Sequence, residues 1–314
     1  LRDLTHVAAP LAERFRPRAN RAVGVGGATY ALPLAVGLTG LYYDREHVEA
    51  PPETLDALLA EAAGQRGAAL AAGAREAFWL LPATGGVDLG PDGYPRIDAA
   101  AVAAWVSFLA RAAESPHVVL APDAAAARGA LVAGDAAYLA GGPSALRPLQ
   151  ATLGAERVGV APLPAGPAGP ARPLLTVEGL MLPVPAQARD DSLALAFADY
   201  ATDVAAQTLL VERAGRIPGN VNVSLEAHPA VSALAAQEPQ ALVLPCYPAG
   251  ASPWEAGDAL LEAALATGDG VASGEDDVAP LVERFVALLN GEPATAEAHA
   301  SPEAHAPADT GRWE

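Results

Sequence analysis

Blocks of apolar residues broken by glycine and proline predict strands and helices in turn along the first third of the chain. Residues 31–36 are almost entirely apolar and predict a buried strand. A break at Gly37 to Gly40 separates it from a second strand that ends in Tyr42-Tyr43-Asp44. Two prolines then precede a predicted helix over 53–63, because proline and acidic side chains suit the first helical turn.

Apolar spacing, glycine and proline also predict elements elsewhere in the chain. A long helix is predicted from Ile97-Asp98 to Glu114, with its large apolar residues at the spacing of one helix face. A hairpin-like turn is predicted over 24–30, and the proline-rich stretch 162–173 predicts a loop. Further helices are predicted at 8–15, 75–83, 123–132, 192–202, 204–213, 256–266 and 277–289, and strands or extended segments at 134–139, 158–162 and 174–184.

Strands that alternate with helices predict an α/β protein with mixed, largely parallel sheets. The last residues, 291–314, are rich in Ala, Pro, His and Glu and predict a disordered tail or tether, since they have too few large apolar side chains to form a core. The chain contains no run of about eighteen apolar residues, so no membrane span is predicted. Because the chain starts at Leu1 without a methionine or a signal peptide, we expect it to be processed or truncated.

Charge excludes some classes of partner. The formal net charge is −18, and every basic residue other than histidine is arginine. Such a chain is repelled by phosphates, which argues against nucleic acid and anionic membrane surfaces as partners. The single cysteine, Cys246, excludes an internal disulfide.

Motifs for catalysis and metal binding are weak. The six histidines are scattered and form no His-Glu-x-x-His pattern, so no metal site and no cofactor are expected. No Gly-x-Ser-x-Gly motif is present, which removes the commonest hydrolase reading of an α/β chain. Nothing in the chain pairs a nucleophile or acid with a base, so we predict that the protein is not an enzyme.

Several short motifs occur in an order that resembles one family. They are Gly26-Gly27 with Tyr30 and Pro33, the segment from Phe78 to Gly86, Gly134-Asp135-Ala136-Ala137-Tyr138, Gly141-Gly142-Pro143, Val158 to Pro164, and Gly215-Arg216-Ile217-Pro218-Gly219. In this order and spacing they resemble the extracellular solute-binding proteins of ABC importers, in the branch of maltose-binding protein. The resemblance covers residues 1 to about 290, and the family's opening quarter has no counterpart.

The resemblance implies a two-lobed fold of the periplasmic-binding-protein type II, with a partial N-terminal lobe. Residues 1–36 and 178–225 are assigned to the N-terminal lobe, and residues 41–175 and 245–290 to the C-terminal lobe. It also implies capture of a carbohydrate or similar small polar solute by lobe closure, for an ABC permease, in the periplasm or outside the cell and in association with the membrane. The alternative is a degenerate solute-binding fold that serves as a non-transport interaction or sensory domain, as part of a membrane-protein fusion.

The resemblance also suggests ligand-binding residues, for which packing roles remain open. A sugar needs an aromatic platform for its apolar face and charged planar partners for its hydroxyls. Trp79 lies in an apolar run that favours the core, and Trp254 suits cleft and core equally. Glu178 and Arg75 also suit plain surface positions, and Ser144 stands where the family often places tryptophan. The predicted ligand-binding set is Trp254, Glu255, Trp79, Arg75, Glu178 and Ser144.

Overall fold

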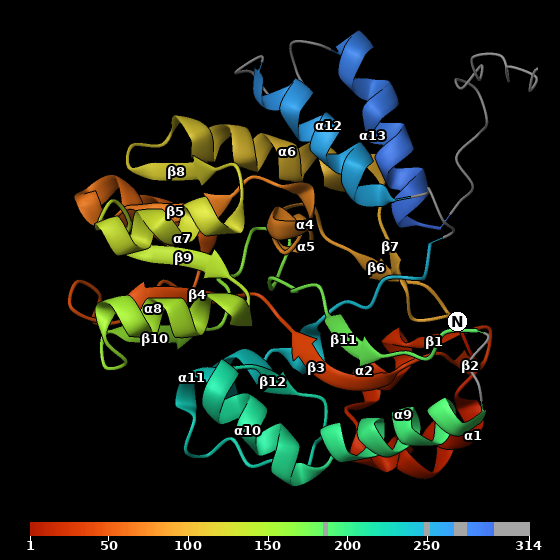
Figure 1. Ribbon diagram of the computed structural model, residues 1–314. Coiled ribbons are helices and arrows are strands. Elements are labelled where there is room, and N and C mark those ends of the chain that lie inside the picture. The colour runs from red at the N-terminus through yellow and green to blue at the C-terminus, as the bar shows by residue number, and fades with distance from the viewer. Residues whose placement is uncertain (185–187, 248–251, 267–274, 292–314) are drawn as a thin grey trace, which may run out of the picture.

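The computed structural model describes residues 1–184, 188–247, 252–266 and 275–291. Two main β-sheets lie one above the other, each with its own helices (Figure 1). The five-stranded sheet has the order β10-β4-β9-β5-β8, and the three-stranded sheet has the order β11-β3-β12. Their strands are β3 (Leu32–Gly37), β4 (Gly40–Asp44), β5 (Ala68–Ala71), β8 (Val118–Ala121), β9 (Tyr138–Gly141), β10 (Val158–Ala161), β11 (Thr176–Leu180) and β12 (Ile217–Pro218).

The predicted mixed α/β class is confirmed, but fewer of the strand pairs are parallel than expected. Parallel pairing joins β5 to β8 and β9, whereas β4 runs antiparallel to β9 and β10, and β3 antiparallel to β11 and β12. Parallel neighbours need a long crossover connection. The chain passes from β3 in one sheet to β4 in the other through Leu38 and Thr39 alone, and β4 is antiparallel to both of its neighbours.

Residues of α6 (Ala99–Glu114), α12 (Pro253–Ala266) and α13 (Glu275–Leu289), which lie together at the top of Figure 1, form much of the core of the five-stranded part. The Trp105 ring stacks on Phe285 at 5.7 Å between centroids, and its Nε1 donates to the Ala77 carbonyl at 3.1 Å. Asp98 accepts from the Ala101 amide at 2.7 Å and so caps α6 where the sequence predicted its start. The helices are α1 (Thr5–Ala8), α2 (Pro17–Ala22), α3 (Leu55–Glu61), α4 (Ala74–Ala77), α5 (Leu80–Gly85), α6 (Ala99–Glu114), α7 (Ala124–Ala133), α8 (Leu146–Leu153), α9 (Ala188–Ala201), α10 (Val204–Ala214), α11 (Pro229–Ala235), α12 (Pro253–Ala266) and α13 (Glu275–Leu289).

Two predicted helices differ in the structure because of proline. The helix predicted over 75–83 is broken into α4 and α5, so that Pro82 falls in the first turn of α5, where no backbone N–H is needed. The helix predicted over 8–15 is the short α1 followed by the 3-10 helix η1 (Ala9–Arg14), with Pro10 near its start. Short non-α helices also occur as η2 (Ala62–Arg66), η3 (Pro143–Ala145) and η4 (Glu238–Gln240).

The predicted turn over 24–30 is confirmed as a two-stranded hairpin. β1 (Gly24–Val25) pairs antiparallel with β2 (Ala28–Thr29). Gly26 and Gly27 between them have φ of +59° and +84°, the positive values that a primed hairpin turn requires. A second small hairpin pairs β6 (Asp88–Leu89) with β7 (Pro95–Arg96).

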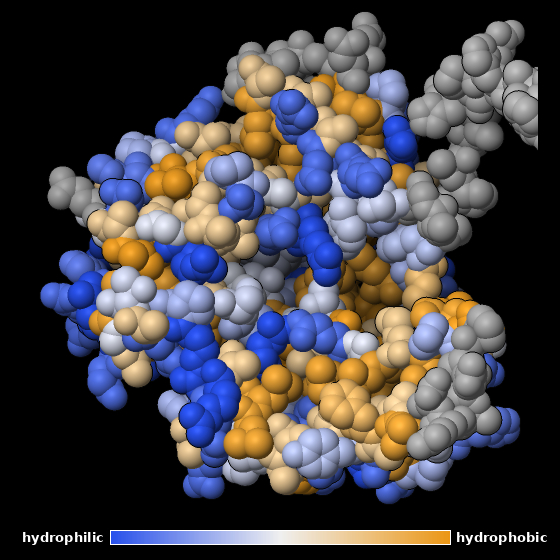
Figure 2. All heavy atoms as spheres, viewed as in Figure 1, coloured by the Kyte–Doolittle hydropathy of each residue, from blue (hydrophilic) through white to orange (hydrophobic). Residues whose placement is uncertain are grey.

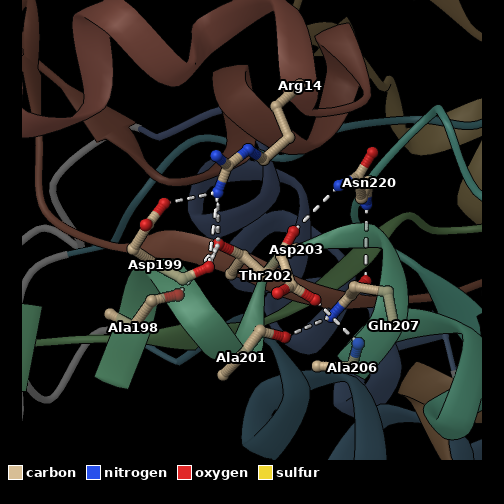
Figure 3. Close-up of polar contacts among 9 residues, drawn as sticks. All are labelled: Arg14, Ala198, Asp199, Ala201, Thr202, Asp203, Ala206, Gln207 and Asn220. Carbon is tan, nitrogen blue, oxygen red and sulfur yellow. Dashed lines mark hydrogen bonds and ion pairs between the residues drawn. The ribbon is translucent and has the colours of Figure 1, made fainter. Parts of the chain in front are cut away.

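A buried polar cluster ties α9 and α10 to the rest of the three-stranded part (Figure 3). The Asn220 side chain donates to the Thr202 carbonyl at 2.9 Å, and the Gln207 side chain donates to the Ala201 carbonyl at 3.0 Å. Arg14 reaches from η1 to the Asp199 carboxylate at 2.7 Å. Thr202, Gln207 and Asn220 are at most 1% exposed, so these bonds hold the two helices firmly in place.

Other sequence expectations concern the ends and the lobes. None of the described helices is both long and apolar enough to cross a membrane. The predicted tail falls, apart from Gly291, outside the described residues. The three-stranded sheet is built from residues 32–37, 176–180 and 217–218, and the five-stranded sheet from residues between 40 and 161. The predicted lobe boundaries stay a prediction.

Candidate functional site

A cavity of about 300 Å³ lies where the three-stranded sheet faces the five-stranded part. Figure 2 shows the surface hollowed between the upper part, which carries α12 and α13, and the lower part. The lining is mixed, with charged and hydroxyl side chains beside small apolar ones. It consists of Gly37, Leu38, Thr39, Arg75, Glu76, Ala124, Gly142, Pro143, Ser144, Leu174, Thr176, Glu178 and Arg216.

An ion pair forms the charged part of the three-stranded side. Glu178 on β11 accepts from the guanidinium of Arg216, which directly precedes β12. The two strands flank β3, whose Ala35 lies opposite both Glu178 and Pro218. The pair therefore links the two strands that flank β3. Glu178 is 58% exposed and Arg216 is 23% exposed, so the carboxylate is the more open of the two partners.

Helix starts form the opposite side of the cavity. Arg75 and Glu76 lie exposed in α4, and Ser144 lies exposed in η3, directly after β9. Within the described residues, neither Arg75 nor Glu76 has an ion-pair partner. Arg75 and Glu76 therefore place one positive and one negative side chain next to each other at the cavity.

At the starts of α4 and α7, protein carboxylates already accept hydrogen bonds from backbone amides. The Ala74 amide at the start of α4 donates to Asp258 of α12 at 2.7 Å. Asp123 accepts from the Ala125 and Ala126 amides at the start of α7, each at 2.8 Å. Free helix N-termini bind anions, but these amides are occupied.

Gln237 joins two of the segments that connect the sheets. Its Nε2 donates to the Thr39 carbonyl at 3.0 Å, between β3 and β4, and its Oε1 accepts from the Leu163 amide at 3.1 Å, after β10. The residue is 6% exposed. A buried side-chain amide with both ends satisfied fixes the spacing of the two connections.

The structure brings together half of the predicted ligand-binding set. Arg75, Ser144 and Glu178 line the cavity, although they come from three distant segments of the chain. Trp79, Trp254 and Glu255 are not among its lining residues. Their role in binding stays a prediction.

The two predicted tryptophans lie in or against the core. Trp79 is 2% exposed within the core cluster. Trp254 is partly buried and meets Phe78 edge to face, with 5.7 Å between ring centroids. Glu255 is exposed in the first turn of α12. Consequently, no aromatic side chain of the described residues lines the cavity.

Sequence reasoning missed several lining residues, above all Arg216 and Glu76. A signal existed for Arg216, because it lies inside the Gly215-Arg216-Ile217-Pro218-Gly219 motif that carried the family resemblance. A charged residue within such a turn is a candidate for function. Glu76 follows directly on the predicted Arg75 and gave no separate signal.

Two carboxylates and a histidine lie close together away from the cavity. Ligand atoms of Asp44, Glu46 and His47 lie within 4.8 Å of one another. However, the Asp44 carboxylate already binds the Arg157 guanidinium and His47. Burial raises the pKa of Asp44, but hydrogen bonds from Arg157, the Glu46 amide and His47 outweigh it and lower this pKa to about 2. The arrangement is that of an ion-pair network, since an arginine already neutralises the carboxylate.

Solved structures show the same fold at low sequence identity. The GacH receptor of Streptomyces glaucescens, described unliganded and with acarbose, has a TM-score of 0.75 and 21% identity, covering 89% of this chain and 76% of its own. Maltose-bound MalE3 of T. maritima has a TM-score of 0.76 and 22% identity, covering 92% of this chain and 79% of its own. The maltotriose-binding protein of Thermus thermophilus has a TM-score of 0.73 and 22% identity, covering 92% of this chain and 79% of its own. No curated protein matches the chain.

A family model provides the assignment that structural likeness alone does not. The model described as bacterial extracellular solute-binding protein matches residues 1–239, well over half of the chain. This match confirms the resemblance drawn from the sequence motifs. It also confirms the prediction that the chain is not an enzyme, because members of this family bind small solutes for ABC importers. The chain belongs to the bacterial extracellular solute-binding protein family.

Proposed function

We propose that the protein captures a carbohydrate or similar small polar solute in the cavity between its two sheets. Capture takes place outside the cytoplasmic membrane, in association with it, and the loaded protein delivers the solute to an ABC permease. The two sheets and their helices act as lobes that close on the solute. The lobes are those predicted from the sequence, joined by the connections that Gln237 holds.

One observation carries the proposal. Arg75, Ser144 and Glu178 come from three separate segments, yet all three line one cavity between the sheets. At about 300 Å³ the cavity is within the usual range for small-molecule sites. Guanidinium and carboxylate groups are strong partners for the donors and acceptors of a polar solute. The cavity therefore suits a small molecule rich in hydroxyl or charged groups.

Contacts from both sides of the cavity supply a reason for closure. Arg75 and Ser144 belong to the five-stranded part, and Glu178 and Arg216 to the three-stranded part. A solute that touches both parts binds the closed arrangement more tightly and shifts the population toward it.

A non-transport interaction or sensory domain is the second candidate function. The observation in its favour is that no aromatic side chain lines the cavity in the described part of the chain. Sugar sites commonly use such a platform for the apolar face of the ring. A domain that no longer carries sugar has no need of one.

A thermal-shift screen separates the two functions. The chain is heated with mono- and oligosaccharides, polyols and amino acids, since a ligand of the folded state raises the melting temperature with concentration. We expect a saturable shift with at least one small polar solute. In calorimetric titration Arg75→Ala and Glu178→Gln each weaken its binding about tenfold, the usual loss for a charged hydrogen bond.

Arg96→Ala is the matched control, because Arg96 is an exposed arginine of β7 outside the cavity. It leaves the affinity unchanged. A flat screen with a cooperatively folded sample counts against solute capture and favours the interaction domain. A shift that survives both cavity substitutions places binding elsewhere.

A further inference from the structure

The cavity between the two sheets carries charges of both signs on both of its sides. Arg75 and Glu76 of α4 belong to the five-stranded part, and Glu178 and Arg216 to the three-stranded part. Figure 2 shows strongly hydrophilic residues above and below the hollow that separates the two parts. The charges of the lining cancel, although the chain as a whole has a formal net charge of −18. The cavity is therefore balanced in charge within a strongly acidic protein.

The charges are neutralised on one side of the cavity and not on the other. On the three-stranded side, the Arg216 guanidinium binds the Glu178 carboxylate directly. On the five-stranded side, Arg75 and Glu76 are both exposed, and neither has an ion-pair partner among the described residues. Consecutive residues of a helix do not face each other, so these two side chains do not neutralise one another. Each therefore lacks a counter-charge at the cavity.

A second carboxylate strengthens the negative charge at Glu76. A Cβ placed on Gly73 would lie 2.5 Å from a carboxylate oxygen of Glu76 and 3.8 Å from one of Asp258. The two acidic side chains thus approach the same point at the start of α4. The Asp258 oxygen is held there by the Ala74 amide at 2.7 Å. Like charges at this proximity repel each other, and a nearby cationic group relieves the repulsion.

Closure of the two parts on a solute makes these charges decisive. Closure removes water from the cavity, and an ionised side chain that loses water without gaining a counter-charge is costly. The hydroxyls of a neutral solute bind Arg75 and Glu76 without neutralising them. A carboxylate instead forms charge-assisted hydrogen bonds with a guanidinium, and an ammonium group forms them with a carboxylate. A solute that carries both groups therefore satisfies both side chains at once.

We propose that the solute is a small zwitterion with one carboxylate and one primary ammonium group, an inference that rests on the proposed function. The Arg75 guanidinium binds the carboxylate of the solute. The Glu76 carboxylate, with Asp258 beside it, binds the ammonium group. The Glu178–Arg216 pair is already neutral and contacts the solute from the opposite side. A cavity of about 300 Å³ is at the small end of the range for ligand sites and suits an amino acid.

A set of matched solutes tests this assignment. The standard amino acids and β-alanine are screened by thermal shift beside monosaccharides and polyols, because a ligand of the folded state raises the melting temperature. The best amino acid is then compared in calorimetric titration with its amide, which lacks the negative charge, and with its hydroxy acid, which lacks the positive charge. We expect the amino acid to bind at least about tenfold more tightly than either analogue, the usual effect of one charged hydrogen bond.

Two variants show which side chain binds which charge. In Arg75→Gln the affinity ratio of amino acid to amide falls to about one, and in Glu76→Gln the ratio of amino acid to hydroxy acid does. A merely structural role would change all affinities together and leave the ratios as they are. Arg96→Gln in β7 and Glu114→Gln at the end of α6 are the matched controls, because both residues are exposed and neither lines the cavity. Both controls keep the parental ratios.

Other results overturn the assignment in distinguishable ways. If a monosaccharide or polyol binds more tightly than every amino acid, the zwitterion is wrong while solute capture stands. The same conclusion follows if the best amino acid binds no more tightly than its amide or hydroxy acid, or if both ratios survive in Arg75→Gln and Glu76→Gln. A flat screen of all these solutes with a cooperatively folded sample contradicts the zwitterion and solute capture together.

Discussion

At the scale of single residues, two buried polar side chains have roles that solution measurements can isolate. Asp44 is 4% exposed at the end of β4 and Gln237 is 6% exposed between the sheets. Asp44 is bound by Arg157, His47 and the Glu46 amide, and Gln237 by the Thr39 carbonyl and the buried Leu163 amide, so removal of either side chain leaves groups without their partner. Such losses cost more than the bond itself contributes.

Asp44 makes the stability depend on pH. Its pKa is lowered to about 2 in the folded protein from an ordinary value of 3.8, so the unfolded state binds the proton more readily. The stabilisation is fully present above about pH 4 and is lost as the pH falls through about 2. We expect Asp44→Asn to lower the unfolding free energy at pH 7 by about 2 kcal/mol. In this variant the unfolding free energy also changes less between about pH 4 and about pH 2.

Urea unfolding at pH 7 and at several acidic pH values measures this effect. Asp88→Asn, at an exposed carboxyl of β6, is the control and keeps the parental pH profile. If the unfolding free energy of Asp44→Asn falls as steeply with decreasing pH as that of the parent, Asp44 is not the cause of the pH dependence.

Gln237 is expected to stabilise the connection between the sheets. Gln237→Ala leaves the Thr39 carbonyl and the Leu163 amide without their partner. We expect a loss of about 1–3 kcal/mol in unfolding free energy with an unchanged denaturant slope. Gln240→Ala, at an exposed position in η4, is the control and costs almost nothing. Equal effects at the two positions would contradict the bridging role.

At the scale of elements, the packing of α5 on α6 depends on the absence of a side chain. A Cβ at Gly85 would lie 2.3 Å from the Cα of Ala101 and 2.4 Å from its carbonyl oxygen. These are backbone atoms of a long helix, so they cannot move aside independently. Gly129 in α7 is different, because a Cβ there meets nothing within 4 Å.

The same substitution is therefore expected to act in opposite directions in these two helices. Gly85→Ala forces α5 and α6 apart and destabilises the protein by about 1–3 kcal/mol. Gly129→Ala improves helix propensity and stabilises it by up to about 1 kcal/mol. Thermal unfolding of the two variants beside the parent measures both. A higher melting temperature for Gly85→Ala would show that the helices are not packed this closely.

At the scale of the whole molecule, solute binding is expected to bring the two sheets and their helices closer. The cavity is lined from both parts, so a bound solute favours the arrangement in which both touch it. We expect a saturating solute found by the thermal screen to reduce the radius of gyration in X-ray scattering. Arg75→Ala needs a higher solute concentration for the same change, while Arg96→Ala behaves like the parent.

A radius of gyration that stays constant at saturation, with binding confirmed by calorimetry, would mean that capture proceeds without closure. In that case contacts to one part alone hold the solute. Comparison of Arg75→Ala with Glu178→Gln then tells which part, because the two residues lie on opposite sides of the cavity.

The sequence by itself determined the elements whose signals are local. The capped helix α6, the glycine turn between β1 and β2, and α10 between Asp203 and Gly215 follow from cap, turn and periodicity rules that act within a few residues. Motif order also identified the family, because a series of short motifs constrains the fold more than any one of them. Proline broke the helix predicted over 75–83, a local effect that apolar spacing alone did not reveal.

The tertiary structure alone decided which residues share the cavity. Arg216 meets Glu178 because β11 and β12 flank β3, a pairing between segments far apart in the chain. Trp79 lies in the core, as its apolar run favoured, whereas only the structure shows that Trp254, equally suited to cleft and core, packs on Phe78. The ion pair and the lining of the cavity depend on contacts between segments far apart in the chain, which local residue patterns do not specify.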